Sequence, residues 1–160
     1  MIFVTLGTHP QQFDRLLREV DSLVSSKKIK EPVFAQTGHS TYKPKNFESK
    51  KFLPIGEFNK QLKGASLVIT HAGEGNIGLC KNLPKKMIVV PRRKEFQEHT
   101  NDHQLELAKV VEGKKLGLVA WSEKDLGKKL SEIKVFTPRT VPTGKIVPLL
   151  GDFYSKEFSA

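Results

Sequence analysis

The sequence predicts an α/β fold built on one parallel, Rossmann-like sheet with helices on both faces. Three observations predict it: short apolar runs rich in β-branched residues, amphipathic segments between them, and glycine-containing turns after several of the runs. Because strand–helix–strand crossovers are right-handed, this alternation builds a parallel sheet. Ligands bind such sheets beyond the carboxyl ends of the strands, where Gly7, Gly38, Gly73 and Pro91 fall.

The N-terminal part of the chain alternates strand, helix and strand. Residues 2–6 have the composition of a strand, and the turn 7–10 ends it. From Phe13 to Val24 the apolar residues keep helical spacing, which predicts a helix packed on the sheet. A second strand is predicted at 32–36, closed by the polar turn 37–41.

The middle of the chain begins with a poorly periodic segment. Residues 42–57 predict a loop around one minor strand at 52–53, and a short helix follows at 58–64. The apolar run 67–69 predicts a buried strand, and residues 77–82 a helix after a small-residue turn.

The last predicted elements continue the alternation. A buried strand at 87–90 is stopped by Pro91, and a helix is expected from near His99 to Gly113. A final strand is predicted at 116–120. Ser122, with Asp125 three residues later, predicts the N-cap of a helix that reaches Ile133.

Composition predicts one soluble domain, 1–136, and a separate C-terminal tail, 137–160. The 160-residue chain has no apolar run close to membrane-spanning length, and its N-terminus lacks the features of a signal peptide. The single cysteine, Cys80, forms no internal disulfide, so the cytoplasm is the expected compartment. Prolines and glycines preclude a long helix in the tail, whose Phe153 and Tyr154 either wrap over the sheet or await a partner.

The net charge of +10 attracts anions but does not choose among them. Nucleic acid, anionic lipid and phosphorylated substrates all fit the charge, and a merely solvated surface remains the alternative. A recognition helix or basic residues interleaved with exposed aromatics are missing, so no nucleic-acid partner is predicted.

The segment from Gly73 to Gly78 matches G-x-G-x-x-G between a strand and a helix. This is the fingerprint of dinucleotide binding, and Arg92 and Arg93 after the next strand suit a 2′-phosphate. An NADP-binding oxidoreductase is therefore one hypothesis, although the motif follows a middle strand rather than the first.

His99 and His103 have the spacing of metal ligands on one helical face. The local sequence supplies no third ligand, and histidines near a helix start also serve as hydrogen-bonding groups. No metal site is therefore predicted.

Hydrogen-bonding and cationic side chains gather after the strands at 67–69 and 87–90. They are His71, Arg92, Arg93, His99, Asn101, Asp102, His103 and Gln104. A diphosphate needs backbone N–H groups at a helix N-terminus and cations, and a sugar needs amide and carboxylate side chains. This stretch offers both.

Several segments resemble the PssE-type (also called EpsF-type) exopolysaccharide glycosyltransferase subunits. They are the residues 4–9, 36–42, 69–73 and 90–104. The resemblance extends to the donor-binding subunit of the dolichol-linked UDP-GlcNAc transferase and to the C-terminal half of MurG, all in the glycosyltransferase family 28 C-terminal domain group.

The resemblance implies the donor-binding, C-terminal half of a GT-B glycosyltransferase. Such a half works with a membrane-anchored, PssD-like subunit that holds a polyprenyl- or dolichyl-diphosphate-linked acceptor, and the catalytic base is expected on that partner. Neither a metal nor a cofactor is implied, since the UDP-sugar is a substrate. The implied donor-binding residues are Gly7, Thr8, His9, Thr37, Gly38, His71, Ala72, Gly73, Glu74, Gly75, Asn76, Arg92, Arg93, His99, Asn101, Asp102, His103 and Gln104.

This sequence departs from the family pattern at Glu74 and Leu79. Relatives commonly carry a small residue or proline at the first position, and many carry a ribose-binding acid near the second. Arg92 and Arg93 predict a carboxylated donor such as UDP-glucuronate, with contact to a partner or lipid headgroups as the alternative. A subunit that enhances its partner's activity without binding donor is a further hypothesis.

Overall fold

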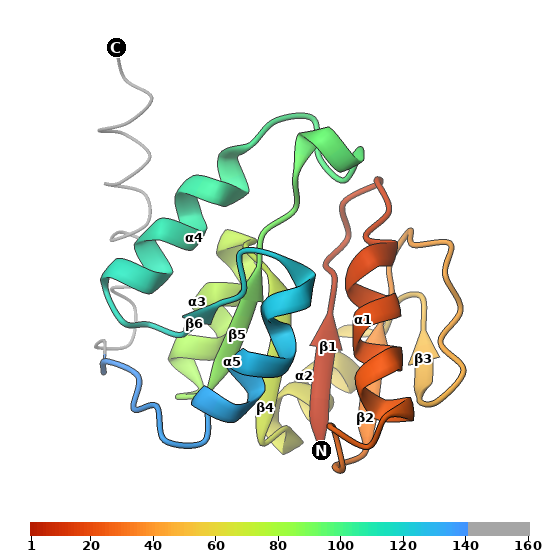
Figure 1. The fold of residues 1–160 in the computed structure, drawn as a ribbon, viewed down its shortest axis with the longest axis horizontal. Helices are drawn as coiled ribbons and strands as arrows, with labels where there is room; N and C mark the ends of the chain where they lie inside the picture. The colour runs from red at the N-terminus through yellow and green to blue at the C-terminus, as the bar shows by residue number, and fades with distance from the viewer. Residues whose placement is uncertain (141–160) are drawn as a thin grey trace.

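A computed structural model describes residues 1–140 of the chain, and the predicted tail residues Phe153, Tyr154 and Phe158 lie outside that part. One six-stranded parallel sheet has the order β3-β2-β1-β4-β5-β6 (Figure 1). The strands are β1 (Ile2–Thr5), β2 (Val33–Gln36), β3 (Glu48–Lys50), β4 (Leu67–His71), β5 (Met87–Val90) and β6 (Leu118–Val119). The predicted parallel fold is therefore confirmed.

Helices cover both faces of the sheet, as predicted. The helices are α1 (Asp14–Ser25), α2 (Ile55–Gly64), α3 (Glu74–Asn82), α4 (His103–Gly113) and α5 (Leu126–Glu132), with short 3₁₀ turns η1 (Lys94–Phe96) and η2 (Glu123–Asp125). One face packs against α1 and α5, which lie in front in Figure 1, and the other packs against α2, α3 and α4.

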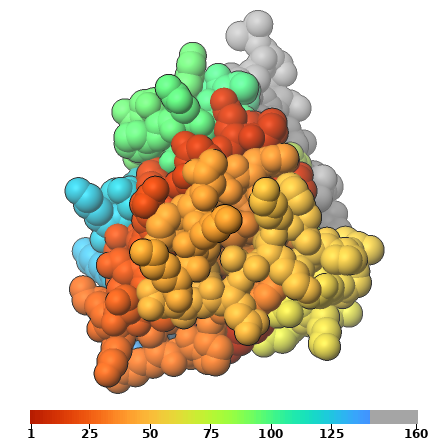
Figure 2. All heavy atoms as spheres, turned by 90° about the vertical axis from the view of Figure 1, so that its right-hand side faces the viewer, coloured from red at the N-terminus to blue at the C-terminus, as the bar shows by residue number. Residues whose placement is uncertain are grey.

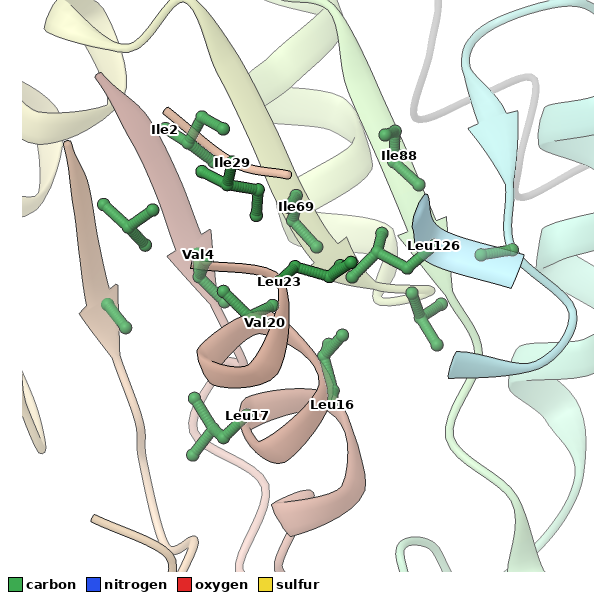
Figure 3. Packing of buried hydrophobic residues seen from close by; sticks show 14 of the residues in the cluster. Ile2, Val4, Leu16, Leu17, Val20, Leu23, Ile29, Ile69, Ile88 and Leu126 are labelled. Carbon is green, nitrogen blue, oxygen red and sulfur yellow. The ribbon is translucent and has the colours of Figure 1, made fainter. Parts of the chain in front are cut away.

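The core divides into one apolar layer on each face. On the α1 side, Leu16, Val20 and Leu23 project from successive turns of the helix onto β1 and β4 (Figure 3). On the other side, Cys80 of α3 is buried among residues of α4 and the central strands. Alternate residues of each central strand face opposite layers, which explains why their sequences are apolar throughout.

Several element boundaries differ from the sequence prediction. The minor strand lies at Glu48–Lys50 and not at 52–53, because the exposed edge strand contains no apolar residue to mark it. Helix α2 begins at Ile55, directly after Pro54. Helix α3 begins at Glu74, and Gly73 precedes it in an extended conformation.

Helix α4 begins at His103 rather than near His99. The Asn101 side chain accepts the backbone N–H of His103 at 3.1 Å, so the chain turns just before the helix. The predicted N-cap at Ser122 is confirmed. The Ser122 side chain accepts the backbone N–H of Lys124 at the start of η2, and the Asp125 side chain accepts the backbone N–H of Ser122, which together form a capping box.

Candidate functional site

A pocket of about 680 Å³ opens at the carboxyl ends of the central strands. The strand order reverses between β1 and β4, so the loops after these two strands separate around a crevice. The pocket is lined by Gly7, Thr8, His9, Gln36, Phe52, Leu53, Ile55, Phe58, His71, Gly73, Gly75, Asn76, Leu79, His99 and Gln104. Nine of the predicted donor-binding residues are in this lining: Gly7, Thr8, His9, His71, Gly73, Gly75, Asn76, His99 and Gln104.

His71, the last residue of β4, is held in a defined tautomer by Gln104. The Gln104 side-chain oxygen accepts the backbone N–H groups of Ala72 at 3.2 Å and Arg92 at 3.0 Å. Its amide nitrogen lies 3.0 Å from Nδ1 of His71 and therefore donates to it. The proton of the imidazole is consequently on Nε2.

His71 is a neutral hydrogen-bond donor at physiological pH. Burial, with a smaller contribution from the nearby Arg92 guanidinium, lowers the pKa of His71 to about 3. The ring therefore presents Nε2–H to its surroundings without carrying a formal charge.

Two glycines make room for this ring. A Cβ atom on Gly7 would lie 2.5 Å from Nε2 of His71, and one on Gly73 would lie 2.1 Å from its Cε1. Gly7 also has a φ of +71°, which favours glycine. Only glycine at both positions allows the histidine to sit between the two loops with bare backbone on either side.

The N-terminus of α3 borders the same pocket. No side chain caps this helix end, since the residue at the N-cap is Gly73. The Asn76 amide donates to Thr70 Oγ1 at 3.1 Å and lies 3.5 Å from Thr5 Oγ1, which ties the first turn of α3 to paired residues of β4 and β1. An uncapped helix N-terminus beside bare glycine backbone is a favourable position for a phosphate.

An apolar wall faces these polar groups. It consists of Phe52, Leu53, Ile55, Phe58 and Leu79. Phe58 is held by an edge-on contact with Phe3 at 5.4 Å, whereas Ile55 is 75% exposed. Sequence patterns did not place this wall in the site. The available signal was the adjacent apolar pair Phe52 and Leu53 in a proline-bounded segment, and this pair predicted a minor strand instead.

Arg92 is buried and has structural partners. Its guanidinium donates to the carbonyl oxygen of Leu6 at 2.7 Å and to those of Gln11, Gln12 and Glu98 at 2.9 to 3.2 Å. The side chain is 1% exposed and does not line the pocket. It therefore fastens the loop after β1 to the segment after β5.

Arg93 points away from the pocket lining. Its guanidinium donates to the carbonyl oxygen of Trp121 at 2.7 Å and pairs with Glu95 at 3.2 Å. Neither arginine presents its guanidinium to the pocket, so the prediction of a uronic acid donor has no support from this geometry.

The turn after β2 supports the loop after β1. The N–H groups of Thr37 and Gly38 donate to the carbonyl oxygens of Lys50 and Lys51. A Cβ atom on Gly38 would lie 2.7 Å from the carbonyl oxygen of Gly7. Thr37 and Gly38 are thus close to the site, but neither lines the pocket.

The remaining predicted residues surround the pocket at its edges. Ala72 is buried behind His71, and Glu74 is half-buried at the start of α3. Asp102 accepts the backbone N–H of Lys94 at 3.0 Å, just before α4. Asn101 and His103 flank Asp102, outside the lining.

No group of three or more His, Cys, Asp or Glu residues in the described part of the chain has the arrangement of a metal site. His99 precedes α4 and His103 is its first residue, so the two do not lie one turn apart on a helix. The ring of His99 instead stacks on that of His9, with centroids 4.3 Å apart.

Comparison with known proteins places this fold among glycosyltransferases. The chain is 35% identical over 117 residues to the human "UDP-N-acetylglucosamine transferase subunit ALG13", an alignment that covers 68% of this chain and 10% of that protein.

Solved structures share the fold. The glycosyltransferase of kitacinnamycin superimposes with a TM-score of 0.63 at 19% identity, over 95% of this chain and 37% of that one. MurG of Acinetobacter baumannii superimposes with a TM-score of 0.54 at 17% identity, over 93% of this chain and 49% of that one. The chain therefore spans less than half the length of these proteins. The family model of the glycosyltransferase family 28 C-terminal domain matches residues 1–143, so the chain belongs to that family.

Proposed function

We propose that this chain is the donor-binding subunit of a two-component GT-B glycosyltransferase. It binds a UDP-sugar and, with its partner, transfers the sugar to a polyprenyl- or dolichyl-diphosphate-linked acceptor. The pocket between β1 and β4 carries this proposal, because it combines an uncapped helix N-terminus, bare glycine backbone and a fixed imidazole N–H donor. Membership of the family and the name of the human relative support it.

The two walls of the pocket suit different parts of a UDP-sugar. The diphosphate lies at the start of α3, where Gly7, Gly73 and the His71 N–H group surround it. The uracil lies against the apolar wall, since an aromatic ring gains from apolar contacts. The sugar extends toward residues 101–104 at the start of α4.

The ribose subsite differs from that expected of the family. Leu79 lines the pocket and is 37% exposed, so an apolar side chain stands where many relatives carry an acid. Glu74 is close, in the first turn of the same helix, and is the candidate replacement.

The departing UDP is stabilised without a metal in this proposal. The dipole of α3 and the neutral N–H donors face the diphosphate, and such preorganised groups stabilise developing negative charge. The catalytic base is proposed to come from the partner.

Exposed apolar side chains support a partner at the carboxyl edge of the sheet. Large hydrophobic residues exposed there are Phe52, Ile55, Leu79 and Phe96. The second half of a GT-B enzyme covers the donor site from this side, which would bury them. The tail 137–160 remains a proposed additional docking segment.

Attachment to the membrane is proposed to occur through the partner. The described residues include no helix long and apolar enough to cross a membrane. A cavity at the opposite edge, where the strands begin, is lined by Lys27, Lys28, Lys30, Lys86, Lys124, Lys128 and Lys134. Lysines near an anionic surface contribute about 1 kcal/mol each, so this edge adds attraction to the cytoplasmic leaflet.

Calorimetric titration of the purified chain with UDP tests the proposal. We expect UDP to bind, and we expect NADP, the control ligand, not to bind. Absence of UDP binding would instead favour the subunit that enhances its partner without holding donor, and preferential NADP binding would favour the oxidoreductase.

The donor sugar is tested by competition. We expect UDP-glucose and UDP-GlcNAc to displace UDP at least as well as UDP-glucuronate, because no arginine among residues 1–140 lines the pocket. A clear preference for UDP-glucuronate would restore the carboxylate-reading role of Arg92 or Arg93.

A further inference from the structure

Two histidines form a stacked pair in the wall of the donor pocket. His9 comes from the loop after β1 and His99 from the segment that follows β5, and both line the pocket. Their ring centroids are 4.3 Å apart and the ring planes differ by 26°. Two imidazoles at this distance cannot both carry a proton without strong repulsion.

Each ring of the pair is oriented in the same way. Nδ1 of His9 accepts the backbone N–H of Gln11, and Nδ1 of His99 accepts that of Asn101, both at 3.3 Å. In the neutral state each ring therefore carries its proton on Nε2. Protonation of Nδ1 places two N–H donors opposite each other, so the ring or the backbone N–H must shift when the pair takes up its proton.

The surroundings keep the pair neutral while the pocket is empty. The pKa of His9 is lowered by burial first, and then by His99, Arg92 and His39. The pKa of His99 is lowered by burial first, and then by Arg92 and His103, whereas a bond to Asn101 and the charge of Asp102 act in the opposite direction.

The pocket otherwise lacks a positive side chain of its own. Among the described residues its lining contains no Lys, Arg, Asp or Glu, and Arg92 lies behind it with its guanidinium on carbonyl groups. His71 is also unavailable as a cation, because burial and the nearby Arg92 guanidinium lower its pKa to about 3. Among residues 1–140, the stacked pair is therefore the only part of the lining that can gain positive charge when a diphosphate enters.

We propose that His9 and His99 act as one unit that takes up a single proton from solvent when a nucleoside diphosphate enters the pocket. An anion within a few ångströms favours the charged form of an imidazole, and the stacking limits the pair to one proton. This proposal rests on donor binding in the pocket.

Proton uptake also acts on the reaction itself. The leaving UDP gains negative charge as its bond to the sugar breaks, and the protonated pair beside the diphosphate stabilises that charge more strongly than it stabilises the donor. The pair would thus help to supply the electrostatic role that a metal has in other transferases.

The test is calorimetric titration with UDP at pH 7.0 in PIPES, HEPES and Tris. The dependence of the observed enthalpy on the buffer's ionisation enthalpy gives the number of protons exchanged. We expect the wild-type chain to take up more protons than the double variant His9→Gln/His99→Gln, with a difference of up to about one proton, because either ring alone can still accept it. Lys60→Gln is the control, because Lys60 is exposed on α2 and outside the pocket lining, and it should behave as wild type.

The pKa values of the two rings can also be measured directly in the wild-type chain, which requires no variant to fold. The ring resonances of His9 and His99 in the wild-type chain are followed by NMR from pH 5 to 8, with and without UDP. A rise of about one unit or more in one of the two midpoints on adding UDP supports the proposal.

The outcomes separate the two levels of the proposal. UDP binding with unchanged midpoints, and with equal proton numbers in wild type and the double variant His9→Gln/His99→Gln, overturns the role of the pair and leaves donor binding intact. Failure of UDP to bind the wild-type chain overturns donor binding, and the pair then loses its ligand.

Discussion

At the scale of single residues, the site depends on one imidazole ring between two glycines. His71 fills the space that side chains on Gly7 and Gly73 would need, and Gln104 fixes its tautomer. The glycines are therefore required by a neighbouring side chain as well as by a ligand. A loop that is rich in glycine but lacks this ring would not present the same N–H donor.

Replacing Gly73 by Ala should weaken UDP binding about tenfold or more. The new Cβ atom would lie 2.1 Å from His71, so the ring must leave its position, and such overpacking costs about 1–3 kcal/mol. Gly56→Ala is the control, since nothing lies within 4 Å of a Cβ atom there. Titration with UDP and thermal unfolding measure the two effects. Wild-type affinity in Gly73→Ala would contradict the packing argument.

His71 should make stability depend on pH. Its pKa is about 3 in the folded chain and ordinarily 6.5, so below pH 6.5 the unfolded chain binds a proton that the folded chain excludes. The contribution is fully present above pH 6.5 and is lost as pH falls toward 3, at up to about 1.4 kcal/mol per pH unit. The lowered pKa values of His9 and His99 act in the same direction.

Urea unfolding at pH 7.0, 6.0 and 5.0 measures this dependence. His71→Gln should reduce the slope by about one proton, because glutamine fits the hydrogen bond to Gln104 but does not titrate. His39→Gln, at an exposed position, is the control. An unchanged slope in His71→Gln would show that the ring is protonated in the folded chain.

At the scale of elements, Arg92 joins segments that the sheet itself leaves unconnected. It donates to carbonyl groups after β1 and to Glu98, whose carboxylate pairs with Arg15 of α1 at 2.6 Å. Glu98 is 1% exposed, so this ion pair is buried. The network holds the loop of His9 against the segment of His99.

Arg92→Lys should lower the free energy of unfolding by about 3 kcal/mol, because an ammonium cannot reach four carbonyl oxygens and leaves buried groups unpaired. Arg93→Lys, at a half-buried position with two partners, should cost about 1 kcal/mol or less. Urea unfolding compares the two variants. Equal losses would mean that Arg92 is not the central connection.

Sequence patterns predicted the elements that bury an apolar face. The strands at 2–6 and 87–90 and the helix of Leu16 to Leu23 were found because burial requires apolar residues at fixed spacing. The edge strand Glu48–Lys50 is exposed throughout, so no pattern marked it. The start of α4 was missed because its apolar spacing begins only at Leu105, within the helix.

Sequence reasoning located the glycine and histidine part of the site but not its apolar wall. Turn glycines and histidines after strands are recognisable because parallel strands bring their carboxyl ends together. Arg92 was predicted to bind the donor because it follows a strand end beside the proposed sugar site and a guanidinium pairs well with a carboxylate. Its burial follows from carbonyl groups of distant loops, which no local pattern contains.

At the scale of the whole molecule, the chain is proposed to form one side of a reaction cleft. The pocket and the exposed apolar residues Phe52, Ile55 and Phe96 share the carboxyl edge of the sheet, while the lysine-lined cavity occupies the other edge. The segment from Ser40 to Gly64, orange to yellow in Figure 2, covers the side of the molecule that joins these edges.

Sugar transfer should require a second protein. We expect the purified chain to bind UDP but to show no transfer to a polyprenyl-diphosphate-linked acceptor, and transfer to appear on adding the membrane-anchored subunit. Radiolabelled sugar incorporation measures this. Transfer by the chain alone would show that it contains a complete active site.

Truncation after Phe136 should leave UDP binding intact and weaken co-purification with the partner.

The buried thiol of α3 allows local opening of the protein to be measured by chemical labelling. Burial raises the pKa of Cys80 to about 12, and the sequence contains no other cysteine, so a disulfide reagent such as DTNB reacts only when this helix separates from the core. The diphosphate is proposed to bind at the N-terminus of the same helix. UDP at 100 times its Kd should therefore slow labelling by about 100-fold, while the urea-unfolded chain labels at once. Labelling that ignores UDP would place the ligand on a part of the molecule that opens independently of α3. The rate of this colour reaction thus reports, without any acceptor or partner, whether donor binding holds α3 against the core.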